Sequence, residues 1–269
     1  MLNPYLIEGP ALISFSGGRT SAYMLHEILR AFDGALPSNI HVTFANTGKE
    51  REETLRFVHD CATHFKVHVR WLERAQEGGF IEVGYNSASR SGEPFAALIA
   101  KKQYTPNAVT RFCTVELKIM VMRDFGLSLG WDRWNNIVGL RYDEGHRVLK
   151  ALERNDTGKE RFKAVMPLSR AHVTRRDVEA FWKRQPFDLG LRSYEGNCDL
   201  CFLKSRAKLE AIIRENPGIE RWWSDQEIVG KGRFVTERSY ADLASHVERS
   251  PTLFDDDEHD VECGLLCQP

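Results

Sequence analysis

A glycine-rich segment near the N-terminus has the residue types of an anion site. In SFSGGRTS (14–21), two glycines precede hydroxyl residues at the opening of a helical pattern. Backbone N–H groups that converge at the positive end of a helix bind phosphate or pyrophosphate. The candidate phosphate-binding residues are Ser14, Ser16, Gly17, Gly18, Arg19, Thr20 and Ser21. The spacing differs from the G-x-x-x-x-G-K-[ST] loop, and a tight strand–helix turn that only requires glycine is the alternative.

Two further segments place polar or basic residues directly after strand-like runs. Asn46, Thr47 and Gly48 follow the first of these runs and could bind adenine or ribose through hydrogen bonds. In GLRYDEGHR (139–147), Gly139 is followed by Arg141 and Arg147, which could clamp phosphate or sulfate as bidentate donors. A solvated charged loop is the competing interpretation of the arginine segment.

The cysteines are grouped in a way that points to metal or redox chemistry. Cys198 and Cys201 form a C-x-x-C pair, and Cys113 opens a helical pattern whose dipole would favour a thiolate. Zinc, an iron–sulfur cluster, a redox pair and two idle thiols all remain open for the C-x-x-C pair alone. Cys61 lies on an apolar helix face and is expected in the core, while Cys263 and Cys267 lie near the C-terminus.

The elements that must position these residues alternate between strand and helix. Strands are predicted at 11–16, 41–48, 66–73 and 135–142. Helices are predicted at 52–65, 113–126, 173–185 and 204–216. A further helix is predicted after the first strand, with Ala22, Leu25, Ile28 and Leu29 on a single face. This order predicts an α/β fold with an open, mostly parallel, Rossmann-like sheet. Ligands bind beyond the carboxyl ends of strands in such sheets, which is where the turns at 16–21 and 46–50 fall.

The remaining chain divides into less regular parts. Residues 78–110 are expected to form a loop-rich insertion, and a charged loop is expected after the strand at 135–142. We expect a main domain at 1–210, a small helical appendage at 211–254 and an acidic, cysteine-bearing tail at 255–269. Trp222 and Trp223 are expected to pack the appendage against the main domain.

The composition excludes several classes of protein. The chain has 269 residues, 37 Lys+Arg against 38 Asp+Glu, and 42% hydrophobic and 28% charged residues. That balance is ordinary for a globular protein and excludes a strongly basic nucleic-acid coat, although the basic residues of 141–176 could form a local face for RNA or DNA. A solvated surface is the commoner explanation of such a run. No apolar run reaches the roughly 18 residues of a membrane span, and the N-terminus lacks a secretory pattern. We therefore expect a cytoplasmic protein with reduced thiols.

Taken in order, these segments resemble a known family. SFSGGRTS resembles the pyrophosphate loop of the adenine-nucleotide alpha hydrolase (PP-loop) superfamily, and the chain is similar to its phosphoadenosine phosphosulfate (PAPS) reductase branch. The matching segments are FANTGKEREETLRFV (44–58), RFCTVELK (111–118), GLRYDEGHR (139–147), MPLSRAHVTRRDVEAFW (166–182) and LGLRSYEGNCDLC (189–201). The resemblance covers roughly residues 11–210.

The resemblance also implies a cofactor. Cluster-bearing adenylylsulfate reductases hold a [4Fe–4S] cluster with a Cys-Cys pair and a distant C-x-x-C, but Phe112 stands at the first position of that pair here. The implied ligands are therefore Cys113, Cys198 and Cys201, which resembles the three-cysteine arrangement of ATP-dependent tRNA thiolases. A tail cysteine as fourth ligand, zinc in place of iron, and the absence of metal are the alternatives.

The C-terminal segment VECGLLCQP (261–269) resembles the E-C-G-[IL]-H end of the reductases. That likeness would make Cys263 a nucleophile toward the sulfur of a bound sulfonucleotide, with a thioredoxin-like reductant. Leu266 replaces the histidine, and the acidic run 255–260 would repel an anionic substrate. An idle tail is the alternative.

Three functions follow from the resemblance. The first is cleavage of ATP to AMP and pyrophosphate, with Mg²⁺, Arg141 and Arg19 stabilising charge, coupled to sulfur transfer to an acceptor such as a tRNA or DNA base. Thr20 replaces the aspartate of the SGGxDS form of the loop, which bears on the Mg²⁺ geometry. The second is reduction of PAPS or adenosine phosphosulfate (APS) to sulfite by Cys263, and the third is a nucleotide-binding accessory role. The sulfur donor and the formation of a homodimer are left open by the sequence.

Overall fold

The computed structural model describes residues 3–196 and 198–250, and its centre is a six-stranded sheet. The strand order is β4-β3-β2-β1-β5-β6, and only β4 runs antiparallel to its neighbour. The strands are β1 (Ala11–Ser14), β2 (Ile40–Ala45), β3 (Val69–Arg74), β4 (Phe80–Val83), β5 (Trp134–Ile137) and β6 (Phe162–Val165). This arrangement confirms the predicted open, mostly parallel α/β fold.

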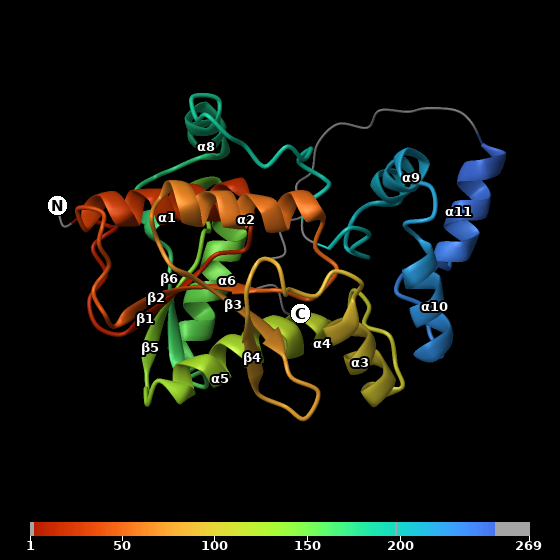
Figure 1. The fold of residues 1–269 in the computed structure, drawn as a ribbon, viewed down its shortest axis with the longest axis horizontal. Helices are drawn as coiled ribbons and strands as arrows, with labels where there is room; N and C mark the ends of the chain where they lie inside the picture. The colour runs from red at the N-terminus through yellow and green to blue at the C-terminus, as the bar shows by residue number, and fades with distance from the viewer. Residues whose placement is uncertain (1–2, 197, 251–269) are drawn as a thin grey trace.

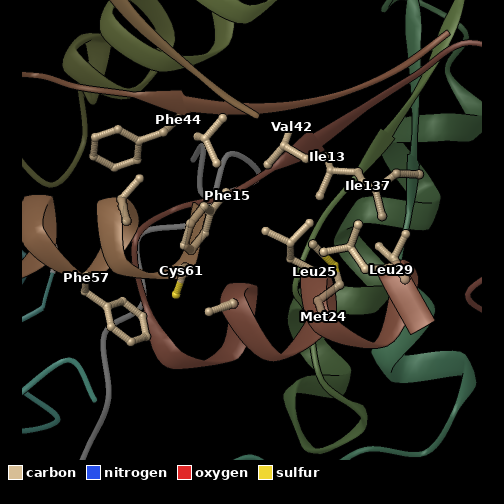
Figure 2. Close-up of a cluster of buried hydrophobic side chains, with 14 of the residues drawn as sticks. Ile13, Phe15, Met24, Leu25, Leu29, Val42, Phe44, Phe57, Cys61 and Ile137 are labelled. Atoms are coloured by element: carbon tan, nitrogen blue, oxygen red, sulfur yellow. The ribbon is translucent and has the colours of Figure 1, made fainter. Parts of the chain in front are cut away.

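Helices cover both faces of the sheet (Figure 1). On one face lie α1 (Arg19–Ala31), α2 (Glu52–His64) and α8 (Arg175–Trp182), and on the other lie α5 (Met120–Ser128) and α6 (Gly145–Asp156). Figure 2 shows the first of these layers, where side chains of β1 and β2 meet those of α1 and α2. Cys61 is fully buried there, as expected for a core cysteine.

A third hydrophobic core joins the C-terminal helices to an internal one. The C-terminal helices are α9 (Arg206–Glu215), α10 (Arg221–Val229) and α11 (Tyr240–Arg249). They pack with α3 (Glu93–Lys102) around Phe95, Trp223, Phe234 and Tyr240, which are all at most 1% exposed. Trp223 packs against Phe95 of α3, as expected for a tryptophan that joins the C-terminal helices to the rest of the chain.

Several predicted elements need correction. The interval 78–110 is not simply a loop, because it contains β4 and α3, and the charged loop expected after β5 contains α6. The sequence of α6 is highly charged, and this obscures the periodic signal of its inward face, on which Val148 and Ala151 lie about one turn apart. The strand β6 was missed because it is only four residues long. Asn155 of α6 makes hydrogen bonds with both the backbone O (2.9 Å) and the backbone N (2.8 Å) of Ala164, so α6 covers this edge strand.

Other predicted boundaries shift in ways that affect the site. The helix expected at 113–126 consists of α4 (Phe112–Thr114), a π-helical turn η1 (Val115–Ile119) and α5. The strand expected at 135–142 ends at Ile137, after which the chain leaves the sheet and passes through the short 3-10 helix η2 (Tyr142–Glu144). The remaining short helix is α7 (Pro167–Arg170), and Thr174 caps α8 as predicted, with Asp177 completing a capping box. Among the described residues, no helix is long and apolar enough to cross a membrane.

Candidate nucleotide and cysteine site

The turn between β1 and α1 has the geometry of an anion-binding loop. Gly17 has a φ of +79°, and a Cβ atom at that position would lie 2.6 Å from Cγ2 of Thr54. Gly18 has extended backbone and caps α1 without a side-chain hydrogen bond. The first-turn N–H groups of α1 are therefore left without a capping side chain, at the positive end of a 13-residue helix.

Two hydroxyls stiffen this loop. Ser21 donates from Oγ to the backbone O of Gly18 (3.0 Å) and accepts from the backbone N of Ser16 (3.2 Å). The Oγ atoms of Ser16 and Ser21 are 3.0 Å apart. Ser14 behaves differently, because its buried hydroxyl donates to Oδ1 of Asn136 (2.6 Å) inside the sheet and does not line the loop.

Arg141 lies beyond the end of β5, and its side chain reaches the loop. Its buried guanidinium donates to Oγ1 of Thr20 (3.0 Å) and to Oδ1 of Asp143 (3.0 Å). Gly139 permits this approach, since a Cβ atom there would lie 3.3 Å from Cα of Ser21. Arg147 lies in the first turn of α6 and forms an ion pair with Glu144.

Arg19 points away from the loop that it follows. Its guanidinium donates to Oδ1 of Asp188 (2.7 Å) and to the backbone O of Leu191 (3.0 Å). The Arg19 hydrogen bond contributes to holding the pKa of Asp188 below its ordinary value, against the opposing effect of burial. Arg19 therefore ties the segment after α8 to the start of α1 instead of presenting a free charge.

The loop after β2 is held from several directions. Asn46 donates from Nδ2 to Oε1 of Glu73 (2.6 Å) and to the backbone O of Ser89 (2.8 Å), and its Oδ1 accepts from the backbone N of Gly48 (3.1 Å). Gly48 has a φ of +79°, and a Cβ atom there would lie 3.0 Å from Cα of Gly92. The Asn46 amide thus positions the loop, which leaves reading of a nucleotide to other groups.

The same loop also contacts the C-x-x-C segment. Thr47 donates from both its backbone N (2.9 Å) and its Oγ1 (2.8 Å) to Oε2 of Glu50. Because that hydroxyl proton is used, Oγ1 of Thr47 is the acceptor for Sγ of Cys198, 3.6 Å away. Glu50 also forms an isolated antiparallel bridge with Cys198, and its Oε1 lies 3.6 Å from Nζ of Lys118.

The three predicted ligand cysteines line one small cavity. Its volume is about 20 Å³, and its walls include Cys113, Cys198, Cys201, Thr47, Arg111, Lys118, Phe95, Phe202 and Trp223. Burial raises the pKa of the Cys198 thiol well above its ordinary value, and Glu50 adds to this effect while Lys118 opposes it. Cys113 and Lys118 are five residues apart in sequence, which places both on the cavity because the intervening turn is π-helical.

Buried ion pairs and hydrogen bonds fix the C-x-x-C segment in place. Nζ of Lys49 lies 2.8 Å from Oδ2 of Asp199, and the backbone N of Asp199 donates to the backbone O of Lys49 (2.8 Å). Trp223 donates from Nε1 to Oδ1 of Asp199 (2.8 Å). Lys204 donates to the backbone O of Cys198 (2.7 Å), and burial lowers the pKa of its ammonium group.

Comparison with known proteins identifies the family. The phosphoadenosine phosphosulfate reductase domain profile matches residues 10–189, which include the turn between β1 and α1 and Arg141. The chain belongs to the PAPS reductase domain family. Its sequence is 28% identical over 224 residues to the uncharacterized nin region protein ORF290 of Escherichia phage lambda, covering 80% of this chain and 73% of the relative.

Two other similar proteins are more distant. The uncharacterized protein MJ0066 of Methanocaldococcus jannaschii is 26% identical over 226 residues; the match covers 80% of this chain and 41% of that protein's length. Among solved structures, U34-tRNA thiolase NcsA from Methanococcus maripaludis with its [4Fe-4S] cluster has a TM-score of 0.42 and 14% sequence identity. That match covers 98% of this chain and 82% of the thiolase chain.

The cysteine cavity of this PAPS reductase family member has the right donor atoms for a soft metal, but its volume is too small for a cluster. Three thiols with two cationic neighbours, Arg111 and Lys118, suit a metal bound as thiolates or an anionic cluster. Within residues 3–196 and 198–250, however, no three Cys, His, Asp or Glu side chains converge as a ligand set. A cavity of about 20 Å³ holds roughly one water molecule, so a cluster would require the thiols to move apart.

Two predicted residues cannot be placed, and two others were missed. Cys263 and Cys267 lie outside the described residues, as does the acidic run 255–260. Arg111 and Lys118 were not predicted to line the cysteine cavity. Arg111 lies two residues before Cys113, which was a usable signal, whereas a five-residue spacing is not a helical signal unless the π turn is known.

Proposed function

We propose that this chain binds an adenine nucleotide at the loop between β1 and α1 and uses it in sulfur chemistry at Cys113, Cys198 and Cys201. The observation that carries the proposal is the contact between Thr47 and Cys198. The loop at 46–50 follows the strand next to β1, and its residues bond with the C-x-x-C segment. A nucleotide site and a thiol site that share one loop can serve a single reaction.

The reaction that suits this arrangement is activation by ATP. A substrate oxygen attacks the α-phosphorus, the bond to the bridging oxygen breaks, and pyrophosphate leaves. The first turn of α1 and Arg141 would stabilise the charge on the phosphates, and Mg²⁺ would enter with the nucleotide. Hydrosulfide then attacks the activated carbon, the carbon–oxygen bond breaks, and AMP leaves with that oxygen. We propose a nucleic-acid base, in tRNA or DNA, as the acceptor.

The cysteines supply the sulfur side of this proposal. If their thiols moved apart, Cys113, Cys198 and Cys201 would hold a [4Fe–4S] cluster, and the cluster would supply iron-bound sulfur chemistry at this position. Lys118 and Arg111 would balance the negative charge of thiolates at this position. Lys204 holds the backbone of Cys198 in place by donating to its carbonyl oxygen.

Two measurements test the proposal separately. Equilibrium binding of ATP should be weakened by Arg141→Lys, which removes the bidentate fork, and unchanged by Arg170→Lys at an exposed position. Iron and acid-labile sulfide, assayed with zinc after anaerobic purification, should approach four of each per chain. Equal ATP binding by both variants would overturn the nucleotide site, and the absence of iron would overturn the cluster.

The family match favours one second candidate. PAPS reductase domains suggest that the chain reduces PAPS or APS to sulfite, with Cys263 as the nucleophile and a thioredoxin-like reductant. Deletion of residues 261–269 should then abolish sulfite release. The same deletion should leave ATP cleavage intact if the first proposal is correct. Binding of ATP without turnover under any condition would favour an accessory role.

A further inference from the structure

Two segments beside the cysteine cavity form a basic and partly apolar surface. We call residues 101–111 and 228–233 the rim. A Cβ atom at Gly230 would lie 2.6 Å from Cγ2 of Thr105, and one at Gly232 would lie 2.7 Å from Oγ1 of Thr105. The two segments therefore pack directly on each other. The cavity is adjacent, because Arg111 lines it and Phe112 precedes Cys113.

The rim carries positive charge without acidic residues. Its basic residues are Lys101, Lys102, Arg111, Lys231 and Arg233, and neither segment contains Asp or Glu. Lys101, Lys231 and Arg233 are exposed. Lys102 forms an ion pair with Glu116, a carboxylate that also faces Arg74. The charge of this surface is complementary to phosphate groups.

Large apolar side chains stand exposed among these charges. Tyr104 is 40% exposed, Val109 is 72% exposed and Ile228 is 76% exposed. The Tyr104 ring lies 5.9 Å from the Phe112 ring, between centroids, so aromatic groups run from the surface toward Cys113. Exposed aromatic rings beside basic groups are the elements with which proteins stack unpaired bases and hold the phosphate backbone.

The Tyr104 ring is held in place before any ligand arrives. Asn107 donates from Nδ2 to the Tyr104 hydroxyl (2.8 Å), and its Oδ1 accepts from the backbone N of Val109 (2.9 Å) and of Thr110 (2.9 Å). The Tyr104 hydroxyl also lies 2.8 Å from Oγ1 of Thr110. A fixed ring loses little conformational entropy when a base stacks on it.

From these observations we propose that the rim binds single-stranded RNA and places one unstacked base beside the cysteine cavity. This inference rests on the proposed function, for which it names the acceptor. RNA loops are the usual source of splayed, unstacked bases in protein recognition, whereas bases inside a duplex are not available at such a surface. A protein partner would be expected to match the exposed charges of Lys101, Lys231 and Arg233 with acidic groups.

The test measures binding of a short fluorescent RNA hairpin with a single-stranded loop by anisotropy, using the full chain. Tyr104→Ala should weaken binding roughly tenfold or more, while Tyr104→Phe, which keeps the ring, should retain most of the affinity. Lys231→Gln with Arg233→Gln should lower the salt slope by about 0.7 per charge. Lys150→Gln with Lys163→Gln, in the basic run of α6 and β6, is the matched control and should change neither quantity.

Each contrary result would show which part of the reasoning is wrong. Equal binding of a DNA hairpin or an RNA duplex would overturn the choice of RNA loops. If the control pair changed RNA binding and the rim variants did not, the RNA-binding surface would lie on α6 and β6 and the inference would be overturned. RNA binding that depends on the rim, in a chain that fails to bind ATP, would refute the proposed function and leave the surface standing. ATP binding without RNA binding, together with self-association that Tyr104→Ala abolishes, would make the rim a protein interface.

Discussion

Replacing Gly17 by alanine should destabilise the fold much more than the same change one residue later. Gly17 has a φ of +79°, and its missing Cβ would lie 2.6 Å from Cγ2 of Thr54, 3.2 Å from Cγ2 of Val58 and 3.3 Å from Cε2 of Phe44. These neighbours belong to the core between the sheet and α2, so the added methyl group enters a closely packed region.

The expected size follows from two additive costs. A non-glycine residue in the left-handed region costs about 1–2 kcal/mol, and overpacking a core costs about 1–3 kcal/mol. We therefore expect Gly17→Ala to lower the free energy of unfolding by about 2–5 kcal/mol. At Gly18 the φ is −101° and the nearest atom to a new Cβ would be Oγ of Ser16, 3.7 Å away. The cost of Gly18→Ala should therefore stay below about 1 kcal/mol.

Urea denaturation followed by circular dichroism measures both variants, with the unfolding slope checked for constancy. The difference between the two alanines is the quantity of interest, because both add one methyl group to the same loop. Equal losses of stability, or a larger loss at Gly18, would refute the assignment of the left-handed turn and of the contact with Thr54.

Three further changes test other parts of the structure. Asp199→Asn leaves the buried Lys49 ammonium without its ion partner and should cost about 3–5 kcal/mol in urea denaturation. A paired Lys49→Met, Asp199→Asn variant should recover much of this loss, because the asparagine Oδ1 can still accept from Trp223. Asn155→Ala removes both hydrogen bonds to the backbone of Ala164 and should cost about 1–3 kcal/mol; a loss no greater than that of exposed Thr157→Ala would contradict the role of Asn155 at the sheet edge. Burial raises the pKa of Glu227, so the folded chain holds this proton more tightly and the free energy of unfolding should fall as the pH rises above 4.5. Glu227→Gln should show a shallower pH dependence across pH 4.5–7, and parallel curves would show that another group is responsible.

Much of the fold could be predicted because its strongest elements have simple patterns. The apolar run that becomes β1 ends at two glycines, and the helix after it repeats Leu25, Ile28 and Leu29 on one face. The convergence of Thr20 and Arg141 was also accessible, since both follow parallel strands and must meet at one edge of the sheet. By contrast, β4, β6, α3 and α6 are short or highly charged and give weak periodic signals.

The cysteine site depended on contacts that sequence patterns do not encode. The bridge between Glu50 and Cys198 joins positions 148 residues apart, and it is what brings Thr47 to the thiol. Lys118 reaches the cavity only because a π turn replaces an ordinary helical turn. Asn46 matched the family pattern, but its amide is already hydrogen-bonded to Glu73, Ser89 and Gly48. The sequence pattern does not show that residue 89 lies close to β3, where it can accept from Asn46.

The separation of the cysteines along the chain sets the order of events during synthesis. Cys113 emerges 85 residues before Cys198, and at about 5–20 residues per second this interval lasts roughly 4–17 seconds. Two of the three cysteines that line the cavity belong to the C-x-x-C segment, so the cavity is incomplete until that segment has been made. Trp223 of α10, which also lines the cavity, is made later still. Any group that needs all three thiols can therefore be loaded only late in synthesis or after it, once the whole set of cysteines has been made.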